Sequence, residues 1–358
     1  MQTRHVLDIT DLSVEECLDV LQLAAAIRAN PQDYLDACRG KILATLFYEP
    51  STRTQMSFQT AMLRLGGQVI GFDNPMNSSV SKGETLKDTI RVISGYADVI
   101  AMRHPLAGSA AAAALYSRVP VINAGDGGHL HPTQTLADLT TLQHEKGTLS
   151  GLTIGLCGDL KYGRTVHSLI RAMIRFPGNS FVLISTPHLR VPAYIRQALE
   201  EAGCPFTEVD SLSEAMPLLD VLYMTRIQQE RFASRAEYEK QAGIYVLDGQ
   251  KMKLAKPDLA VLHPLPRVDE IAQEVDDDPR AKYFKQTEYG MYARMALIMK
   301  MVEKPRNDPP MCLSGDKGHR CPNPGCITLK ESYLPRKFRP YEEGMLQCAY
   351  CEEAFRAR

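Results

Sequence analysis

The stretch that decides the fold reads Ile42-Leu-Ala-Thr-Leu-Phe-Tyr-Glu-Pro-Ser-Thr-Arg-Thr54. Its first seven residues form a short apolar run that predicts a buried β-strand, and apolar residues recur at helical spacing from Met56 to Leu65. The tetrad Ser51-Thr52-Arg53-Thr54 therefore lies where a strand turns into a helix. A strand followed directly by a helix is the unit from which parallel α/β sheets are built.

The same alternation continues on both sides of this stretch. A helix is predicted from Val14 to Ile27, with Ser13 as N-cap and Glu16 three residues later. Further strands are predicted at 42–48, 68–72, 99–102, 119–123, 153–157, 180–184, 221–224, 245–247 and 260–262, and further helices at 84–96, 133–146, 194–202 and 289–302. This order predicts an α/β fold with two doubly wound parallel-sheet domains joined by helices.

Breaks in the pattern suggest three domains. Gly147 to Gly151 interrupts the alternation, and prolines at 305, 309 and 310 end the last predicted helix. We expect a first domain at 1–147 completed by a helix at 289–303, a second at 148–288, and a small β-rich third at 305–358. A chain of 358 residues is long enough for each of the first two to bury its own core.

Composition and charge narrow the class of protein. The 41 Lys and Arg nearly balance the 42 Asp and Glu, so the chain has no general attraction to nucleic acid or to anionic membranes. The N-terminal residues carry charges and no apolar signal segment, which favours a cytoplasmic location. No phosphate loop of the GxxxxGK[ST] type occurs, and the glycines at 155 and 158 lack the rest of a dinucleotide fingerprint.

The tetrad has two interpretations. Unpaired N–H groups at a helix start attract a phosphate, hydroxyls add donors, and Arg53 supplies a bidentate positive charge. Ser and Thr are also favoured as ordinary N-caps, so the tetrad alone does not decide between a phosphate site and a cap.

Polar residues at the ends of other predicted strands favour a site. Arg103 follows the strand at 99–102, and His131 and Gln134 share one face of a helix start. In the second half, Arg164 follows the predicted strand at 153–157, and Arg226 and Gln228 follow the strand at 221–224. Arginines in this position suit the binding of a dicarboxylate. The prolines of the motif at 263–267 make it rigid and poor in amide donors, so backbone carbonyls of this motif are expected to face a ligand. Ser78 and Lys82 lie in a predicted exposed loop.

The cysteines form two groups. Four are scattered through apolar segments, where a buried free thiol is common. Near the C-terminus Cys321-x4-Cys326 and Cys348-x2-Cys351 make two close pairs separated by a loop, the spacing of a structural tetrahedral zinc site. Cys312 and His319 belong to no such pair and are predicted not to be ligands. The tail has too few apolar residues to fold without the metal.

Together the motifs resemble aspartate carbamoyltransferase over roughly residues 3–303. The resemblance is carried by Ser51-Thr-Arg-Thr54, Lys82-Gly-Glu-Thr-Leu, Arg103-His-Pro, His131-Pro-Thr-Gln-Thr-Leu, Lys161-Tyr-Gly-Arg164-Thr-Val-His and His263-Pro-Leu-Pro-Arg267. The related ornithine carbamoyltransferase typically has His-Cys-Leu-Pro where this chain has His263-Pro-Leu-Pro. The resemblance thus implies transfer of a carbamoyl group from carbamoyl phosphate to aspartate, in pyrimidine biosynthesis, with no cofactor needed for catalysis.

The resemblance also implies roles for single residues. The tetrad would bind the phosphate, and Thr54, Arg103 and His131 would polarise the carbonyl of carbamoyl phosphate. Gln134, Pro264 and Leu265 would position the carbamoyl and amino groups, and Arg164, Arg226 and Gln228 would bind aspartate. Ser78 and Lys82 would reach in from a neighbouring subunit, so the site would be complete only in an oligomer, a trimer or a dimer of trimers.

The cysteine tail resembles the zinc domain of the aspartate carbamoyltransferase regulatory chain, which implies contacts between subunits. Three alternatives stay open at this point: a different acceptor such as ornithine, a catalytically silent scaffold, and nucleic-acid binding by the tail. The last has weak support, because residues 304–358 contain ten Lys and Arg against seven Asp and Glu.

Overall fold

The structure is a computed structural model that describes residues 4–227, 234–239, 241, 243–309, 315–316 and 318–356. The chain divides into two compact units. The first unit comprises Met1–Thr133 and Met291–Arg358, and the second unit comprises Gln134–Gly290.

A four-stranded parallel sheet forms the centre of the first unit, with strand order β2-β1-β3-β4. Its strands are β1 (Ile42–Phe47), β2 (Gln68–Phe72), β3 (Val99–His104) and β4 (Val121–Asp126). Because β1 pairs with β2 on one side and β3 on the other, its residues Leu43, Leu46 and Phe47 are fully buried. The apolar run at 42–48 is thus confirmed as a central strand.

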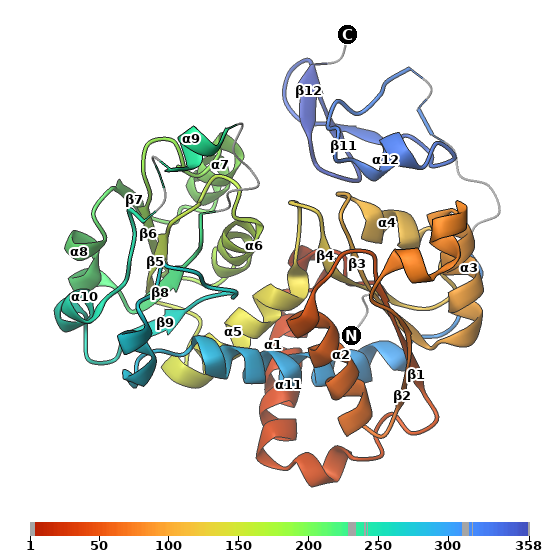
Figure 1. Ribbon diagram of the computed structural model, residues 1–358, viewed down its shortest axis with the longest axis horizontal. Coiled ribbons are helices and arrows are strands. Elements are labelled where there is room, and N and C mark those ends of the chain that lie inside the picture. The colour runs from red at the N-terminus through yellow and green to blue at the C-terminus, as the bar shows by residue number, and fades with distance from the viewer. Residues whose placement is uncertain are drawn as a thin grey trace. The chain divides into compact units, whose positions relative to one another are not determined.

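Helices of the first unit flank this sheet (Figure 1). They are α1 (Val14–Ala29), α2 (Thr52–Arg64), α3 (Leu86–Tyr96) and α4 (Ser109–Ala114). At the start of α1 the predicted cap is confirmed: Ser13 and Glu16 form a capping box. Helix α2 begins directly after Ser51, earlier than the apolar pattern predicted, so most of the tetrad lies inside its first turn.

The second unit is built on a five-stranded parallel sheet with strand order β7-β6-β5-β8-β9. Its strands are β5 (Thr153–Cys157), β6 (Ser180–Ile184), β7 (Phe206–Val209), β8 (Val221–Met224) and β9 (Ala260–Leu262). Its helices include α6 (Arg164–Met173), α7 (Ala193–Glu201), α8 (Leu212–Ala215), α9 (Arg235–Glu239) and α10 (Gly249–Leu254). The two parallel sheets confirm the predicted fold class.

One strand prediction in the second unit is wrong. The apolar residues at 245–247 form no strand, and Leu247 makes only an isolated bridge to Ile271. Tyr245 and Leu247 are nevertheless buried in the apolar core of this unit. Their apolar character reflects burial rather than sheet pairing.

Two long helices run from one unit into the other. They are α5 (Pro132–Lys146) and α11 (Tyr283–Val302). Helix α11 begins six residues before the predicted start at Tyr289. Within the described residues, no helix has the length and apolar character needed to cross a bilayer.

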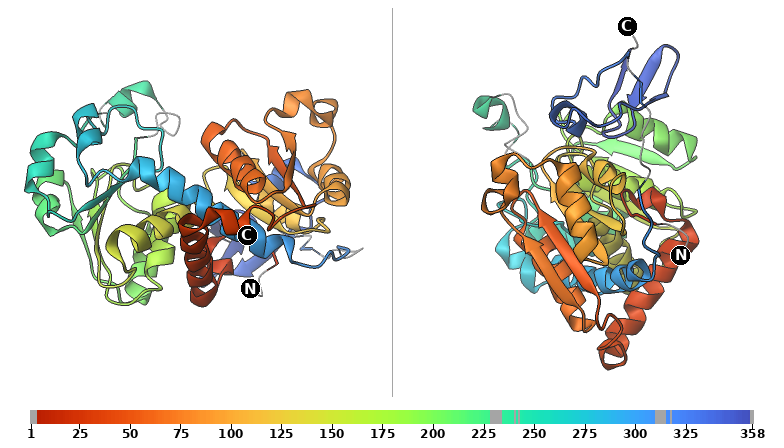
Figure 2. Two further views of the ribbon diagram at one scale, coloured as in Figure 1. Left: turned by 90° about the horizontal axis from the view of Figure 1, so that it is seen from below. Right: turned by 90° about the vertical axis from the view of Figure 1, so that its right-hand side faces the viewer.

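The C-terminal module, residues 319–356, contains an antiparallel sheet and one short helix. Its elements are α12 (Ile327–Lys330), β10 (Phe338–Pro340), β11 (Met345–Cys348) and β12 (Ala354–Arg356). Figures 1 and 2 show the module beside the end of the first sheet at which β3 and β4 finish. Its buried residues, the four cysteines included, belong to one apolar cluster that also contains Ala107, Ala110 and Tyr116 from the segment between β3 and β4. The module and the first sheet therefore share a core.

Candidate active site and metal-binding cluster

The start of α2 lacks the ordinary helix cap. Ser51 occupies the N-cap position, but its side chain makes no capping hydrogen bond, and the first turn contains no acidic residue. By contrast, the side chain of Ser13 accepts a hydrogen bond from the N–H of Glu16 at the start of α1. The N–H groups at the start of α2 therefore have no side-chain partner from the cap, which favours the phosphate interpretation over the cap interpretation.

Three cationic or ionisable side chains gather near this turn. The pKa of Arg53 is lowered by partial burial and by the positive charge of Arg103, so the two side chains are within electrostatic range of each other. Arg103 extends from β3, and its Nη2 lies 2.7 Å from Glu49 Oε1. Burial lowers the pKa of Arg103 even though Glu49 opposes that effect. Glu49 was not singled out from the sequence, although it lies inside the quoted stretch.

Gly125 in β4 brings Arg103 and His131 to the same point. It has a φ of +119°, a conformation that side chains rarely allow. A Cβ at this position would lie 3.0 Å from Arg103 Nη1 and 3.5 Å from His131 Cδ2. The missing side chain therefore leaves room for both groups, and it places the predicted pair Arg103 and His131 together. His131 itself is 5% exposed.

Ser78 and Lys82 lie in a separate loop of short 3-10 turns after β2. The Ser78 hydroxyl donates to Pro75 O at 2.8 Å and accepts from the N–H of Val80 at 3.3 Å. Lys82 ends the second of these turns and is exposed. An exposed lysine on a loop is compatible with a contact to another chain, and that role stays a prediction.

In the second unit, the predicted aspartate ligands follow neighbouring strands. Arg164 is the first residue of α6 after β5, and Arg226 follows β8. These strands pair in parallel, and the N–H of Asp159 donates to Thr225 Oγ1 at 3.0 Å, so the two loops meet at one edge of the sheet. Gln228 lies outside the described residues.

The loop after β9 contains the motif His263-Pro-Leu-Pro-Arg267. His263 Nε2 lies 2.7 Å from Glu270 Oε1, and its Nδ1 accepts from the N–H of Leu265 at 2.7 Å. Leu265 has a φ of +53°, and the bond to Pro266 is cis. Within the part of the chain that the structure describes, no backbone N–H donates to the carbonyls of Pro264 or Leu265. Both carbonyls therefore remain available to a ligand, and their contact with one stays a prediction.

A buried hydrogen-bond network links this loop to Gln134. Gln134 Nε2 donates to Asp138 Oδ1 at 2.8 Å, and Gln286 Nε2 donates to the same oxygen at 2.6 Å. Gln286 Oε1 in turn accepts from the N–H of His263 at 3.0 Å. Asp138 and Gln286 were not recognisable from the sequence, because single polar residues within helical patterns are usually exposed. Both are buried here and hold Gln134 in place.

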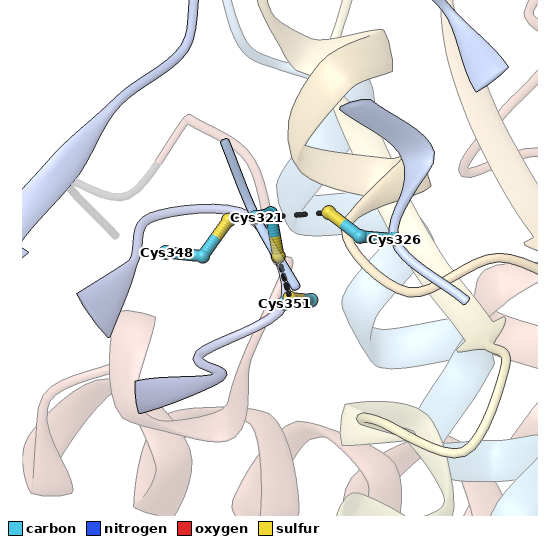
Figure 3. A group of neighbouring side chains, drawn as sticks. All are labelled: Cys321, Cys326, Cys348 and Cys351. Carbon is cyan, nitrogen blue, oxygen red and sulfur yellow. Dashed lines mark hydrogen bonds between the residues drawn. The ribbon is translucent and has the colours of Figure 1, made fainter. Parts of the chain in front are cut away.

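The four predicted cysteines of the C-terminal module form one cluster. Cys321, Cys326, Cys348 and Cys351 are all buried, and their sulfurs lie within 4.8 Å of one another. Figure 3 shows the four side chains converging. Two of the Sγ to Sγ distances are 3.5 and 3.9 Å. Metal–sulfur bonds of about 2.3 Å in a tetrahedron require sulfurs about 3.8 Å apart, so this cluster fits a tetrahedral metal ion.

Comparison with known proteins identifies the family. Residues 4–144 match the profile of the aspartate/ornithine carbamoyltransferase carbamoyl-P binding domain, and residues 150–301 match the Asp/Orn binding domain. The aspartate carbamoyltransferase catalytic subunit of Clostridium perfringens is 60% identical over 303 residues, which cover 84% of this chain and 99% of the relative. The chain belongs to the aspartate carbamoyltransferase family.

Solved structures agree with this assignment. The catalytic subunit of M. jannaschii aspartate transcarbamoylase is 49% identical with a TM-score of 0.79, and the match covers 84% of this chain and 98% of that one. Aspartate transcarbamoylase from Trypanosoma cruzi is 38% identical, also with a TM-score of 0.79, and the match covers 84% and 96% of the two chains. As a carbamoyltransferase, the protein is an enzyme, as the sequence predicted.

The remaining part of this carbamoyltransferase matches a different chain of the same system. Residues 319–358 match the metal binding domain of the aspartate carbamoyltransferase regulatory chain. The prediction of a regulatory-type metal module fused to a catalytic chain is therefore confirmed.

Proposed function

We propose that this protein transfers the carbamoyl group of carbamoyl phosphate to L-aspartate, giving N-carbamoyl-L-aspartate and phosphate in pyrimidine biosynthesis. The observation that carries the proposal is the start of α2, where the cap is absent and Arg53 lies near Arg103. Such a turn suits a phosphate dianion. The T. cruzi relative was solved with carbamoyl phosphate and aspartate bound, which supports both substrates.

In this proposal the first unit binds carbamoyl phosphate. The N–H groups and hydroxyls of Ser51, Thr52 and Thr54 donate to the phosphate oxygens, and Arg53 neutralises their charge. Arg103 and His131, which share the space beside Gly125, donate to the carbonyl oxygen together with Thr54. These donors are fixed by the sheet and α2 before the substrate arrives, so little reorganisation is needed during the reaction.

The second unit binds the acceptor. Arg164, Arg226 and Gln228 bind the two carboxylates of aspartate, which accounts for the arginines at the ends of β5 and β8. Gln134 and the carbonyls of Pro264 and Leu265 orient the amino group. Arg267 serves the fold instead, because it pairs with Asp276 and lies 3.2 Å from the Tyr283 hydroxyl.

The reaction needs no covalent enzyme intermediate. The neutral amine of aspartate attacks the carbamoyl carbon, a C–N bond forms, and negative charge develops on the carbonyl oxygen near Arg103 and His131. As the tetrahedral intermediate collapses, the bond to the phosphate oxygen breaks, and the phosphate leaves with a proton from the amine. Proximity and electrostatic stabilisation supply the rate enhancement.

We further propose that the active enzyme is an oligomer, a trimer or a dimer of trimers, in which Ser78 and Lys82 enter a neighbouring site. Large apolar side chains are exposed on α2, β2 and the loop after it, and contact with another subunit would remove them from water. These are Met56, Leu63, Ile70 and Met76, with exposed fractions of 61, 60, 37 and 70%. We also propose the domain limits 1–147, 148–288 and 305–358 and a cytoplasmic location.

We propose that the metal of the C-terminal module is zinc and that its role is structural. Four thiolates with no open position form the closed site typical of structural zinc, and the sulfur spacing suits it. Carbamoyl transfer itself requires no metal in this proposal. The module binds no nucleic acid and instead mediates protein contacts.

The phosphate assignment is tested with Arg53→Ala. Loss of one such donor typically costs about 10²- to 10³-fold in rate, so carbamoyl transfer should fall by at least that factor. The matched control is Arg64→Ala, which removes the exposed arginine in the last turn of the same helix. Near-normal turnover of Arg53→Ala would show that the phosphate binds elsewhere.

The acceptor is tested by measuring phosphate release from carbamoyl phosphate with aspartate and with ornithine. Release with aspartate alone is expected, and it should be lost in Arg226→Ala. Release with ornithine but not aspartate would contradict the proposed acceptor while leaving the phosphate site intact.

A further inference from the structure

The loop between β4 and α5, residues 126–131, ends at His131 and is fixed by one buried carboxylate. Asp126 is 2% exposed, and its Oδ1 accepts from the N–H of Leu130 at 3.0 Å and from Asn123 Nδ2 at 3.1 Å. The N–H of Asp126 donates to Leu130 O at 3.3 Å. Asp126 therefore sets the backbone immediately before His131.

Backbone hydrogen bonds in the segment after β3 form the first connection between the C-terminal module and Asp126. The N–H of Ala107 donates to Gly325 O at 2.8 Å, and the N–H of Ile327 donates to Ala107 O at 3.0 Å, on either side of Cys326. The next residue, Gly108, donates its N–H to Asp126 Oδ2 at 2.7 Å. The residues beside Cys326 are thus connected to the Asp126 carboxylate through hydrogen bonds at Ala107 and Gly108.

The fit at Gly108 is close. Its φ is +81°, and a Cβ there would lie 2.5 Å from Tyr350 Cβ, between the ligands Cys348 and Cys351. A side chain at this position would push the module away. The contact between module and loop therefore depends on the absence of a side chain at residue 108.

A second route runs through side chains. His129 Nδ1 lies 3.2 Å from Asp126 Oδ2, and His129 Nε2 lies 3.5 Å from Glu352 Oε2 of the module. Burial lowers the pKa of His129, but the two carboxylates outweigh it and raise the pKa to about 10. The ring lies between two carboxylates, which favour its positively charged form.

Glu352 holds this position in an unfavourable backbone conformation. Its φ is +58°, in the left-handed region that glycine tolerates best. Its N–H donates to Cys348 O at 3.0 Å, and its Oε1 lies 3.1 Å from Arg339 Nη2. A glutamate where the backbone favours glycine suggests that the side chain is needed.

We propose that Asp126 is a positioning residue for His131, and that the C-terminal module holds Asp126 through the Glu352–His129 pair and through Gly108. The proposal rests on the role of His131 in the proposed function. The module is then part of the catalytic apparatus of its own chain, in addition to any contact with other subunits.

The variant Glu352→Gly tests the proposal without threatening the fold, because glycine suits the left-handed conformation. It should keep its metal and its thermal midpoint. We expect kcat to fall by about tenfold with little change in the KM for carbamoyl phosphate, because His131 acts on charge that develops in the transition state. Glu353→Ala, an exposed neighbour, and Arg339→Ala, which removes the other partner of Glu352, should keep the kcat of the unchanged chain.

A double-mutant cycle separates positioning from general stability. If Glu352 acts through His129, the pair Glu352→Gly and His129→Ala together should lower kcat no further than the larger single effect. Unchanged kcat in Glu352→Gly, or losses that multiply in the double variant, would overturn this proposal while the unchanged chain stays active. Absence of transfer by the unchanged chain would overturn the proposed function and this inference together.

Discussion

The start of α2 and the cysteine cluster are both sites for a ligand, but they relate to the fold in opposite ways. At α2 the polar groups lie on the outside of a helix that packs on the first sheet, and Arg53 is exposed. In the module the four ligands are themselves core residues, shared with the core of the first unit. The first site can lose its ligand and keep its shape, whereas the second is held together by its ligand.

Because of this difference, substitutions in the two regions should affect different properties of the protein. Substitutions at α2 should report on chemistry, because the apolar face of the helix remains. Substitutions of the four cysteines should report on folding, because few other apolar residues of the module are buried.

The largest expected effect is that of removing the metal. Metal binding supplies about 10 to 16 kcal/mol to small zinc modules, so a chelator should unfold residues 319–356 while the start of α2 keeps its structure. Hydrogen exchange would show loss of protection in β11 and none in β1. The control Cys204→Ser changes a cysteine outside the cluster and should keep the metal. Protection of β11 that survives chelation would contradict the comparison.

The next largest effect is that of acid on the stability of the first unit. Burial lowers the pKa of His104 to about 4, and its Nδ1 accepts from the N–H of Leu106 at 3.0 Å, next to Ala107, which the module contacts. Because the unfolded chain takes up this proton at about pH 6.5, the stability contributed by neutral His104 is present above pH 6.5. It is lost as the pH falls toward 4, at about 1.4 kcal/mol per pH unit.

The measurement is denaturant unfolding of the first unit between pH 7 and 4. His104→Asn keeps a hydrogen-bond acceptor that does not titrate in this range, so it should show a shallower pH slope. An equal slope in both proteins would exclude His104 as the cause.

The smallest effect concerns the two helix starts. Ser13→Ala removes a capping box and should cost about 1 kcal/mol of stability. Ser51→Ala removes no cap, so we expect thermal unfolding to change little while phosphate inhibits the enzyme more weakly. A stability loss in Ser51→Ala equal to that in Ser13→Ala would return the tetrad to the ordinary cap interpretation.

The sequence predicted the elements whose patterns follow burial and missed those whose patterns do not. The start of α11 was placed too late because Gln286 is polar at a buried position, where it binds Asp138 and the His263 backbone. Strand β7 was missed because it is a short edge strand whose residues are only partly buried. At 245–247 an apolar run was mistaken for a strand, since burial alone does not distinguish core loops from strands.

Motifs at strand ends led to the candidate residues Arg103 and Arg164, which lie in β3 and at the start of α6 after β5. The residues that lie next to these side chains in space could not be predicted. Glu49 beside Arg103 and Glu352 beside His129 follow from three-dimensional proximity across the chain, and no local spacing encodes them.

The module contacts the first unit at Ala107 and Gly108. Module and contact surface belong to one polypeptide, because the segment after α11 joins them. Covalent linkage gives such a contact an effective concentration that can reach the millimolar range when the connection is short. Docking of the module should therefore survive dilution that would separate two independent polypeptides. Under these conditions, weak contacts such as the 3.5 Å pair of His129 and Glu352 are sufficient to keep the module docked.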